Sequence, residues 1–190
     1  MVGTIDRNVS RPLPAVAGDE TEAPSLAARA GRPTQAVLSV LRIALGAYFL
    51  WAFFDKLLGL GFSTPAERAW VNGGSPTTGF LSGVEGPFAG VFNGMAGAVW
   101  ADWLFMAALL GIGLALILGI GMRVAAVSGA LLLVFMYLAS LPLETNPVLD
   151  DHLTMALTIV ALAMIGAGDV LGLGRAWKRL ALVRRNPWLV

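Results

Sequence analysis

The chain has 190 residues, the length of one soluble domain, yet 57% of them are hydrophobic and only 13% are charged. A soluble globular domain carries about a quarter charged residues. With 13 basic against 12 acidic residues, the chain lacks the positive field of a nucleic-acid binder. The absence of cysteine excludes disulfides and thiol chemistry, and a single histidine, His152, disfavours a metal site built from protein ligands. These properties indicate a small integral membrane protein.

Four apolar segments are candidates to cross a bilayer core about 30 Å thick, which needs roughly 20 mostly apolar helical residues. The runs from Asp102 to Arg123 and from Arg123 to Glu144 contain no charge between their end residues. The first segment contains Arg42, and the last begins after His152. The sequence therefore predicts an all-α membrane protein, a four-transmembrane-helix bundle with helices near 36–60, 100–121, 123–142 and 149–170.

The connection after the first helix is the longest one, and it covers residues 61–99. Its part over 73–81 carries turn residues and hydroxyls that can cap a short helix, and its part over 86–99 is too apolar to lie in water. We expect short interfacial helices that form a lid on the outer ends of the bundle. The predicted organisation is a disordered cytoplasmic tail (1–35), a four-helix membrane domain (36–175) and a basic cytoplasmic tail (176–190).

Lysine and arginine are distributed unevenly along the chain, and this asymmetry sets the predicted orientation. They gather in both tails and in the turn between the second and third helices, so both termini are expected in the cytoplasm of a multi-pass cell-membrane protein. Residues 1–35 contain no apolar stretch of signal-peptide length. The basic residues of the two tails and of this turn are Arg7, Arg11, Arg29, Arg32, Arg123, Arg175, Lys178, Arg179, Arg184 and Arg185.

Small residues recur every four positions in the second helix, at Gly111, Ala115 and Gly119. In lipid, helices approach closely where small side chains permit it. The stripe predicts a tight hairpin between the second and third helices.

Arg42 is a charge inside a membrane segment, and such a charge usually has a partner or a task. It either snorkels to the cytoplasmic surface or pairs with a carboxylate, for which Asp169 at the inner end of the fourth helix is the natural candidate. Asp151 and Asp169 are 18 positions apart, or five helical turns, and are expected on one face of that helix.

Ionisable side chains also gather at the predicted outer border of all four helices. Each has an ordinary structural explanation, such as a carboxylate that caps a helix N-terminus. However, a carboxylate beside an imidazole accepts protons near neutral pH, and a lysine can bind a carbonyl or anionic oxygen. The residues are Asp55, Lys56, Asp102, Glu144, Asp150, Asp151 and His152.

The order of these features resembles the DoxX family of four-helix bacterial membrane proteins, and its DoxD-like branch in particular. The resemblance covers about residues 36–175. It implies the four-helix fold and an association with thiosulfate:quinone oxidoreductase, or with other membrane redox proteins. The motifs are Arg42, Gly46, Asp55 to Leu57, Asn72 to Leu81, Leu118 to Arg123, Asn146 to His152 and Gly166 to Asp169.

Three functions are compatible with the sequence. The first is an accessory or assembly subunit of a membrane redox or respiratory complex, whose partners are the bilayer and other subunits. The second is a quinone-interacting subunit, in which His152 and Asp151 move protons and Lys56 holds a quinone oxygen, while Arg42, Asp55, Asp102, Glu144 and Asp169 form a binding or structural charge network. The third is transport of a small solute or proton. Since no flavin, haem or metal motif is present, redox chemistry would need a carrier such as a quinone.

Overall fold

The structure, a computed structural model, describes residues 23–144 and 146–190, and this part of the chain is helical without strands. Within these ranges, three helices are long and apolar enough to cross a membrane, namely α2 (Arg32–Leu58), α5 (Val99–Leu118) and α6 (Met122–Ala139). A further apolar helix, α7 (Asp151–Met164), has 14 residues. At 1.5 Å per residue α7 is about 21 Å long, shorter than a bilayer core of about 30 Å. The predicted all-helical fold is confirmed with three candidate membrane spans, whereas α7 falls short of the predicted fourth span.

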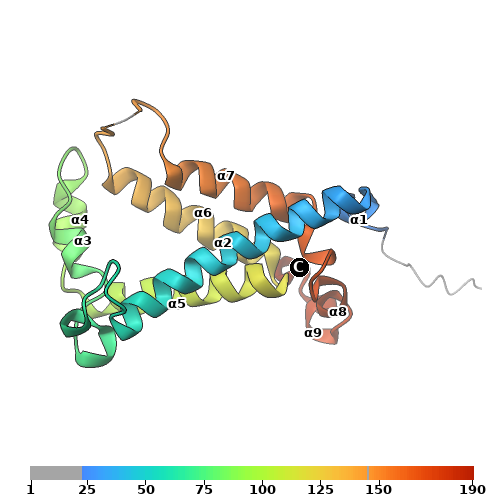
Figure 1. Cartoon of the computed structure of the whole chain (residues 1–190), viewed down its shortest axis with the longest axis horizontal. Coiled ribbons are helices and arrows are strands. Elements are labelled where there is room, and N and C mark those ends of the chain that lie inside the picture. The colour runs from blue at the N-terminus through green and yellow to red at the C-terminus, as the bar shows by residue number, and fades with distance from the viewer. Residues whose placement is uncertain (1–22, 145) are drawn as a thin grey trace, which may run out of the picture.

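The long helices form two pairs, in which α2 packs along α5 and α6 packs along α7. Figure 1 shows that the pairs diverge toward the end of the molecule that carries α3 (Thr78–Ser82) and α4 (Ala89–Met95). We call this the α3–α4 end. One hydrophobic core joins all four helices, and its buried members include Phe49, Met106, Leu133 and Ile159.

The N-terminal part of the described chain is helical where the sequence predicts a disordered tail. Helix α1 (Leu26–Arg29) begins after Ser25, whose side chain accepts a hydrogen bond from the Ala28 amide. Helix α2 begins at Arg32 with a proline in its first turn, a position where proline needs no amide hydrogen. The remainder of the predicted tail, residues 1–22, lies outside the described residues.

The segment between α2 and α5 contains short helices, as the sequence predicts. Two 3₁₀ turns, Ala66–Arg68 and Trp70–Asn72, precede α3 and α4. Apolar side chains of α3 and α4 pack with the start of α5 and the end of α6 in a second, smaller core. The segment therefore bridges the two helix pairs where they diverge. The buried members of this core are Leu81, Val84, Phe92, Ala101 and Ala139.

Helix α7 ends earlier than expected because glycines reverse the chain. Gly166 adopts a left-handed conformation (φ 72°), and Gly168 lies so close to α5 that an added Cβ would be 2.4 Å from the Gly119 carbonyl oxygen. Asp169 lies in the 3₁₀ turn Ala167–Asp169. The expectation that Asp151 and Asp169 share one helix face is therefore wrong.

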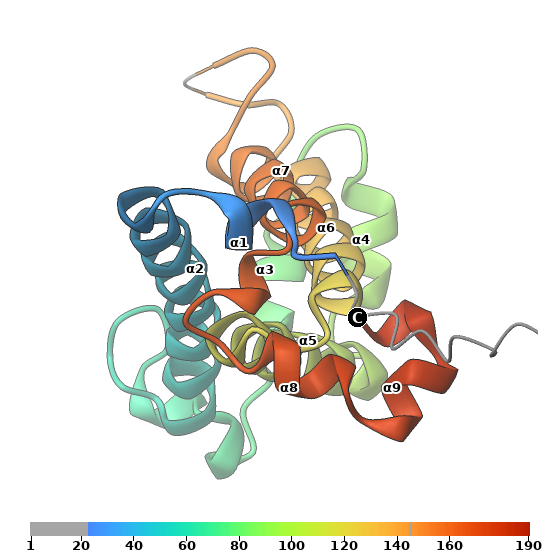
Figure 2. The ribbon, with the colours of Figure 1, turned by 90° about the vertical axis from the view of Figure 1, so that its right-hand side faces the viewer.

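The C-terminal residues fold against the other end of the bundle. Helices α8 (Gly174–Lys178) and α9 (Ala181–Arg185) lie beside the α5–α6 turn, as Figure 2 shows, and we call this the α8–α9 end. The Arg123 amide donates to the Val190 carbonyl oxygen at 2.9 Å, and the Trp177 indole donates to the Leu189 carbonyl oxygen at 2.8 Å. The predicted basic tail is thus docked on the membrane helices.

The close helix approach differs from the one that the glycine stripe predicts. Gly111 has nothing within 4 Å of an added Cβ, and Gly119 faces Gly168 rather than α6. The tightest contact of α5 is with α2, where Gly113 meets Gly46. The prediction that the stripe of small residues packs α5 tightly on α6 is wrong, because the small residue of α5 at the closest helix crossing is Gly113, which faces α2.

Candidate functional site

A cavity of about 900 Å³ lies at the α3–α4 end, between α5, α6 and the segment that bridges them. This volume is at the upper end of the roughly 300–1,000 Å³ range of ligand pockets. Apolar side chains of α5 and α6 provide most of its lining, among them Leu104, Phe105, Leu131 and Phe135. The cavity lies at the end of the molecule where the helix pairs diverge and where α3 and α4 pack with α5 and α6.

Two cations and no carboxylate are found among the described residues that line the cavity. Lys56 is half-buried near the end of α2, with its ammonium group 3.4 Å from the Ser63 hydroxyl and 6.0 Å from the centre of the Phe105 ring. Arg68 comes from the 3₁₀ turn that follows α2 and is exposed. An ammonium group near an aromatic face is stabilised by the ring quadrupole. The cavity therefore has one cationic end and a long apolar part.

Asp55, next to Lys56, holds the chain that leaves α2. It is 1% exposed and accepts hydrogen bonds from the Phe62 amide (3.2 Å), the Ser63 amide (3.1 Å) and the Ser63 hydroxyl (2.6 Å). Three donors satisfy a buried carboxylate that would otherwise be costly. Asp55 thereby fixes Ser63, which lines the cavity.

Asp102 holds the part of the chain that leads into α3. It is 7% exposed and accepts hydrogen bonds from the Ser75 hydroxyl (2.8 Å), the Thr77 amide (3.1 Å) and the Thr77 hydroxyl (2.6 Å). Ser75 also accepts from the Thr78 amide at the start of α3 (3.1 Å). The predicted capping by loop hydroxyls is confirmed here, and both Ser75 and Thr77 line the cavity.

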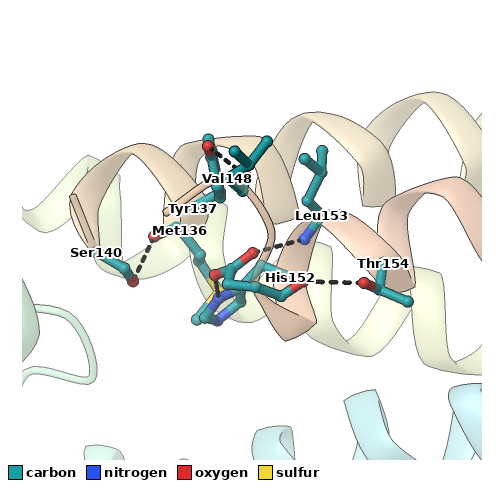
Figure 3. Close-up of polar contacts among 8 residues, drawn as sticks. Met136, Tyr137, Ser140, Val148, His152, Leu153 and Thr154 are labelled. Carbon is teal, nitrogen blue, oxygen red and sulfur yellow. Dashed lines mark hydrogen bonds and ion pairs between the residues drawn. The ribbon is translucent and has the colours of Figure 1, made fainter. Parts of the chain in front are cut away.

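Asp150 and His152 form a separate polar cluster at the start of α7 (Figure 3). The Asp150 carboxylate accepts from the Leu153 amide at 2.9 Å and lies 2.6 Å from the His152 Nδ1. Burial acts to raise the pKa of Asp150, but the hydrogen bonds from Leu153 and His152 outweigh it and keep that pKa below its ordinary value. Tyr137 of α6 donates to the Val148 carbonyl oxygen at 3.0 Å and fastens the α6–α7 connection. The predicted capping role of Asp150 is confirmed.

The residues that the quinone hypothesis combines are not brought together. Lys56 lines the cavity, whereas His152 and Asp151 are not among its lining residues. Asp151 is exposed at the start of α7, and Glu144 is exposed in the α6–α7 connection. The ionisable residues expected to converge at this end therefore lie in two places. Lys56 lines the cavity, and His152 lies beside Asp150 at the N-cap of α7.

Arg42 neither snorkels to the surface nor pairs with a carboxylate, contrary to both predictions. It is completely buried and donates to the carbonyl oxygens of Leu116 and Ile117 at the end of α5, and to those of Val170 and Leu171. These include the final carbonyls of a helix, which lack intrahelical donors and carry the negative end of the dipole. Arg42 therefore caps α5.

Asp169, the expected partner of Arg42, has a different one. Its carboxylate is 2.9 Å from the ammonium group of Lys178 in α8. The predicted Arg42–Asp169 pair is therefore absent, because the guanidinium group is held by backbone carbonyls and Asp169 ties α8 to the bundle.

Several residues of the cavity could not be identified from the sequence. Phe105, Leu131 and Phe135 read as ordinary lipid-facing positions, and Ser75 and Thr77 read as turn residues. The sequence does contain one signal for this contact. Hydroxyl groups such as those of Ser75 and Thr77 can donate to a carboxylate in the first turn of a helix, and Asp102 lies in the first turn of α5.

Comparison with models of protein families, with curated proteins and with solved structures finds no match. The geometry therefore defines this protein only as a helical protein with three helices long and apolar enough to cross a membrane and with an apolar, cation-ended cavity. The resemblance to the DoxX family remains a prediction from its motifs.

Proposed function

We propose that the protein is an accessory subunit of a membrane redox or respiratory complex, and that it holds a lipid-soluble molecule in the cavity at the α3–α4 end. The volume of about 900 Å³ and the apolar lining carry this proposal. Binding sites for small molecules are typically large apolar cavities with a few polar groups at one end. The described residues that line the cavity supply two cations and hydroxyl groups at its polar end.

The second candidate function is that of a quinone-interacting subunit, in which the molecule held in the cavity is a quinone. The Lys56 ammonium group is a donor for a quinone oxygen, and the side chains of Phe105 and Phe135 are suitable neighbours for the ring and its tail. His152 and Asp151, which the sequence favours as proton carriers, are not part of the lining. The quinone proposal therefore rests on binding at Lys56 and on electron carriers in a partner subunit.

The proposal includes four membrane passes with both termini in the cytoplasm. Helix α7 packs along α6 and buries Ile159 and Leu162 in the common core, so it would cross the membrane with the other three. The α8–α9 end carries Arg123, Arg175 and Lys178, as expected for the cytoplasmic side.

The experiment compares two substitutions on neighbouring positions of α5. Ala108 lines the cavity, whereas Ala107 is exposed outside it. Purified protein is extracted with organic solvent, and the lipid-soluble molecules are identified by mass spectrometry. Binding of decylubiquinone is measured in parallel from quenching of tryptophan fluorescence, since Trp100 lines the cavity.

Ala108→Trp fills the cavity and is expected to lose the bound molecule, while Ala107→Trp retains it. Equal retention by both variants would refute the cavity as the binding site. Retention of a quinone by wild type and Ala107→Trp, with loss from Ala108→Trp, would establish the second candidate.

A further inference from the structure

We infer that the cavity at the α3–α4 end takes an amphiphile with one anionic headgroup and a long apolar chain, and that the chain reaches it sideways from the bilayer between α5 and α6. The inference rests on the proposed function, because it names the class of molecule held there.

The polar end of the cavity favours negative charge because the hydroxyl groups of Ser63, Ser75 and Thr77 already donate to carboxylates. The Ser63 hydroxyl donates to Asp55, and the hydroxyls of Ser75 and Thr77 donate to Asp102. Besides the Trp100 indole, the hydrogen-bond donors that remain for a ligand are both cationic, namely the ammonium group of Lys56 and the guanidinium group of Arg68. An anionic oxygen is the group that both cations bind most strongly.

The neighbouring carboxylates Asp55 and Asp102 do not line this end of the cavity, although the charge of Asp55 acts on Lys56 through space. Asp55 and Asp102 are held by three loop donors each and are absent from the lining. Among the ion pairs of residues 23–144 and 146–190, none joins Lys56 to Asp55. Two cations beside apolar surface are stabilised by a ligand that brings a negative charge.

The apolar part of the cavity opens between α5 and α6, on a side that would face lipid. Leu104 of α5 and Leu131 and Phe135 of α6 line the cavity, yet they are 64%, 56% and 54% exposed. These side chains lie on two helices that are long and apolar enough to cross a membrane. A long chain can therefore extend from the cations into the bilayer without crossing a polar barrier.

A neutral quinone satisfies this site less well than an anion. Its ring and tail match the apolar lining, but its oxygens bring no negative charge to Lys56 and Arg68. A carboxylate or phosphate on an alkyl chain satisfies the cations and the lining together.

The test uses the full-length protein in nanodiscs of phosphatidylcholine, with binding measured above empty nanodiscs. Three probes of equal chain length are titrated, namely a fluorescent fatty acid, the alkyl phosphate and the fatty alcohol. Wild type is expected to bind the two anions about tenfold more tightly than the alcohol, a difference of about 1.4 kcal/mol. Stronger binding of the acid than of the phosphate assigns a fatty-acid ligand, the reverse assigns a lipid phosphate, and both outcomes support the inference.

The double variant Lys56→Gln, Arg68→Gln removes both charges and is expected to bind the anions about tenfold more weakly while binding the alcohol as wild type does. The unchanged alcohol affinity shows that the cavity is still folded. Arg175→Gln, which removes an exposed cation from α8, is the matched control and should change nothing.

Equal affinity of wild type for all three probes, or displacement of the fatty acid by equimolar decylubiquinone, would overturn the inference and leave the proposed function standing. The absence of binding of any probe, together with no effect of Ala108→Trp, would overturn the proposed function itself.

Discussion

Gly46 of α2 and Gly113 of α5 pack backbone against backbone. A Cβ added to Gly46 would lie 2.9 Å from the Gly113 carbonyl oxygen, and one added to Gly113 would lie 3.1 Å from the Gly46 carbonyl oxygen. The absence of side chains at both positions therefore permits the crossing of the two helices. At this crossing α5 therefore packs on α2 rather than on α6, the next long helix in the sequence.

Gly113→Ala is expected to destabilise the protein by about 1–3 kcal/mol, because the added methyl group is forced into the α2 backbone and Leu50. The measurement is unfolding in mild detergent followed by circular dichroism. Gly111→Ala is the matched control on the same helix, since a Cβ at Gly111 meets nothing within 4 Å. Equal stability of the two variants would contradict the Gly46–Gly113 contact.

Arg42→Met is expected to destabilise the protein by about 3 kcal/mol, because hydrogen bonds to a charged group are worth roughly 1.5–3 kcal/mol and buried carbonyls lose their donor. Arg42→Lys keeps the charge but lacks the fork that reaches both α5 and the turn at Leu171, so an intermediate loss is expected. The loss is read from the same unfolding measurement in detergent.

The control for Arg42 is Arg175→Met, which removes an exposed cation. If Arg42 acted only by snorkelling to lipid headgroups, Arg42→Lys would be as stable as wild type, and the capping of α5 would be disproved.

The stability of the protein is expected to depend on pH through Asp150. Its pKa in the folded state is held below the ordinary value of 3.8, so the ionised carboxylate stabilises the fold fully well above 3.8 and this stabilisation is lost as the pH falls through the folded-state pKa. Asp150→Asn keeps the N-cap but removes the charge. Wild type should be about 0.3–1 kcal/mol more stable than this variant near neutral pH, and the difference should disappear at acidic pH.

A second substitution separates the cap from the charge at Asp150. Asp150→Ala loses both and should be less stable than wild type by about 1 kcal/mol near neutral pH. A constant difference between wild type and Asp150→Asn from neutral to acidic pH would show that the contact with His152 carries no charge-dependent stability.

The proposed topology is testable because the chain has no cysteine, so one introduced cysteine reports one position. Val148→Cys lies in the exposed α6–α7 connection and Arg175→Cys in α8. A membrane-impermeant maleimide applied to intact cells is expected to label position 148 and to leave position 175 unlabelled. Permeabilised cells, in which both should react, are the control, and labelling at 175 in intact cells would reverse the topology.

The approximate positions of the three long helices could be predicted from hydropathy alone, since a long uncharged run such as that between Asp102 and Arg123 is typical of a membrane-spanning helix. The role of Asp150 as an N-cap was predictable for a similar reason, because the hydrogen bond is made within four residues. Lys56 was identified as a candidate from its place at a helix border, and it lines the cavity.

Long-range partners could not be predicted, because a sequence pattern does not say which segments meet. Arg42 reads as a charge that needs a carboxylate, but the ends of α5 and the turn after α7 supply carbonyls instead. Gly166 and Gly168 read as two of many small residues, whereas the left-handed conformation of Gly166 and the contact of Gly168 with Gly119 explain why α7 stops. The cavity depends on how far two helix pairs diverge, which no local pattern encodes.

The length of α7 affects the lipid as well as the protein. In the proposed four-pass arrangement, a helix about 21 Å long stands beside three longer ones, so the bilayer must become thinner along that flank. Lipid headgroups would then be drawn toward Asp150 and His152 and away from the α5–α6 side, where the cavity opens. The membrane around this protein would accordingly be asymmetric, thin on the α7 side and of full thickness where an amphiphile is taken up.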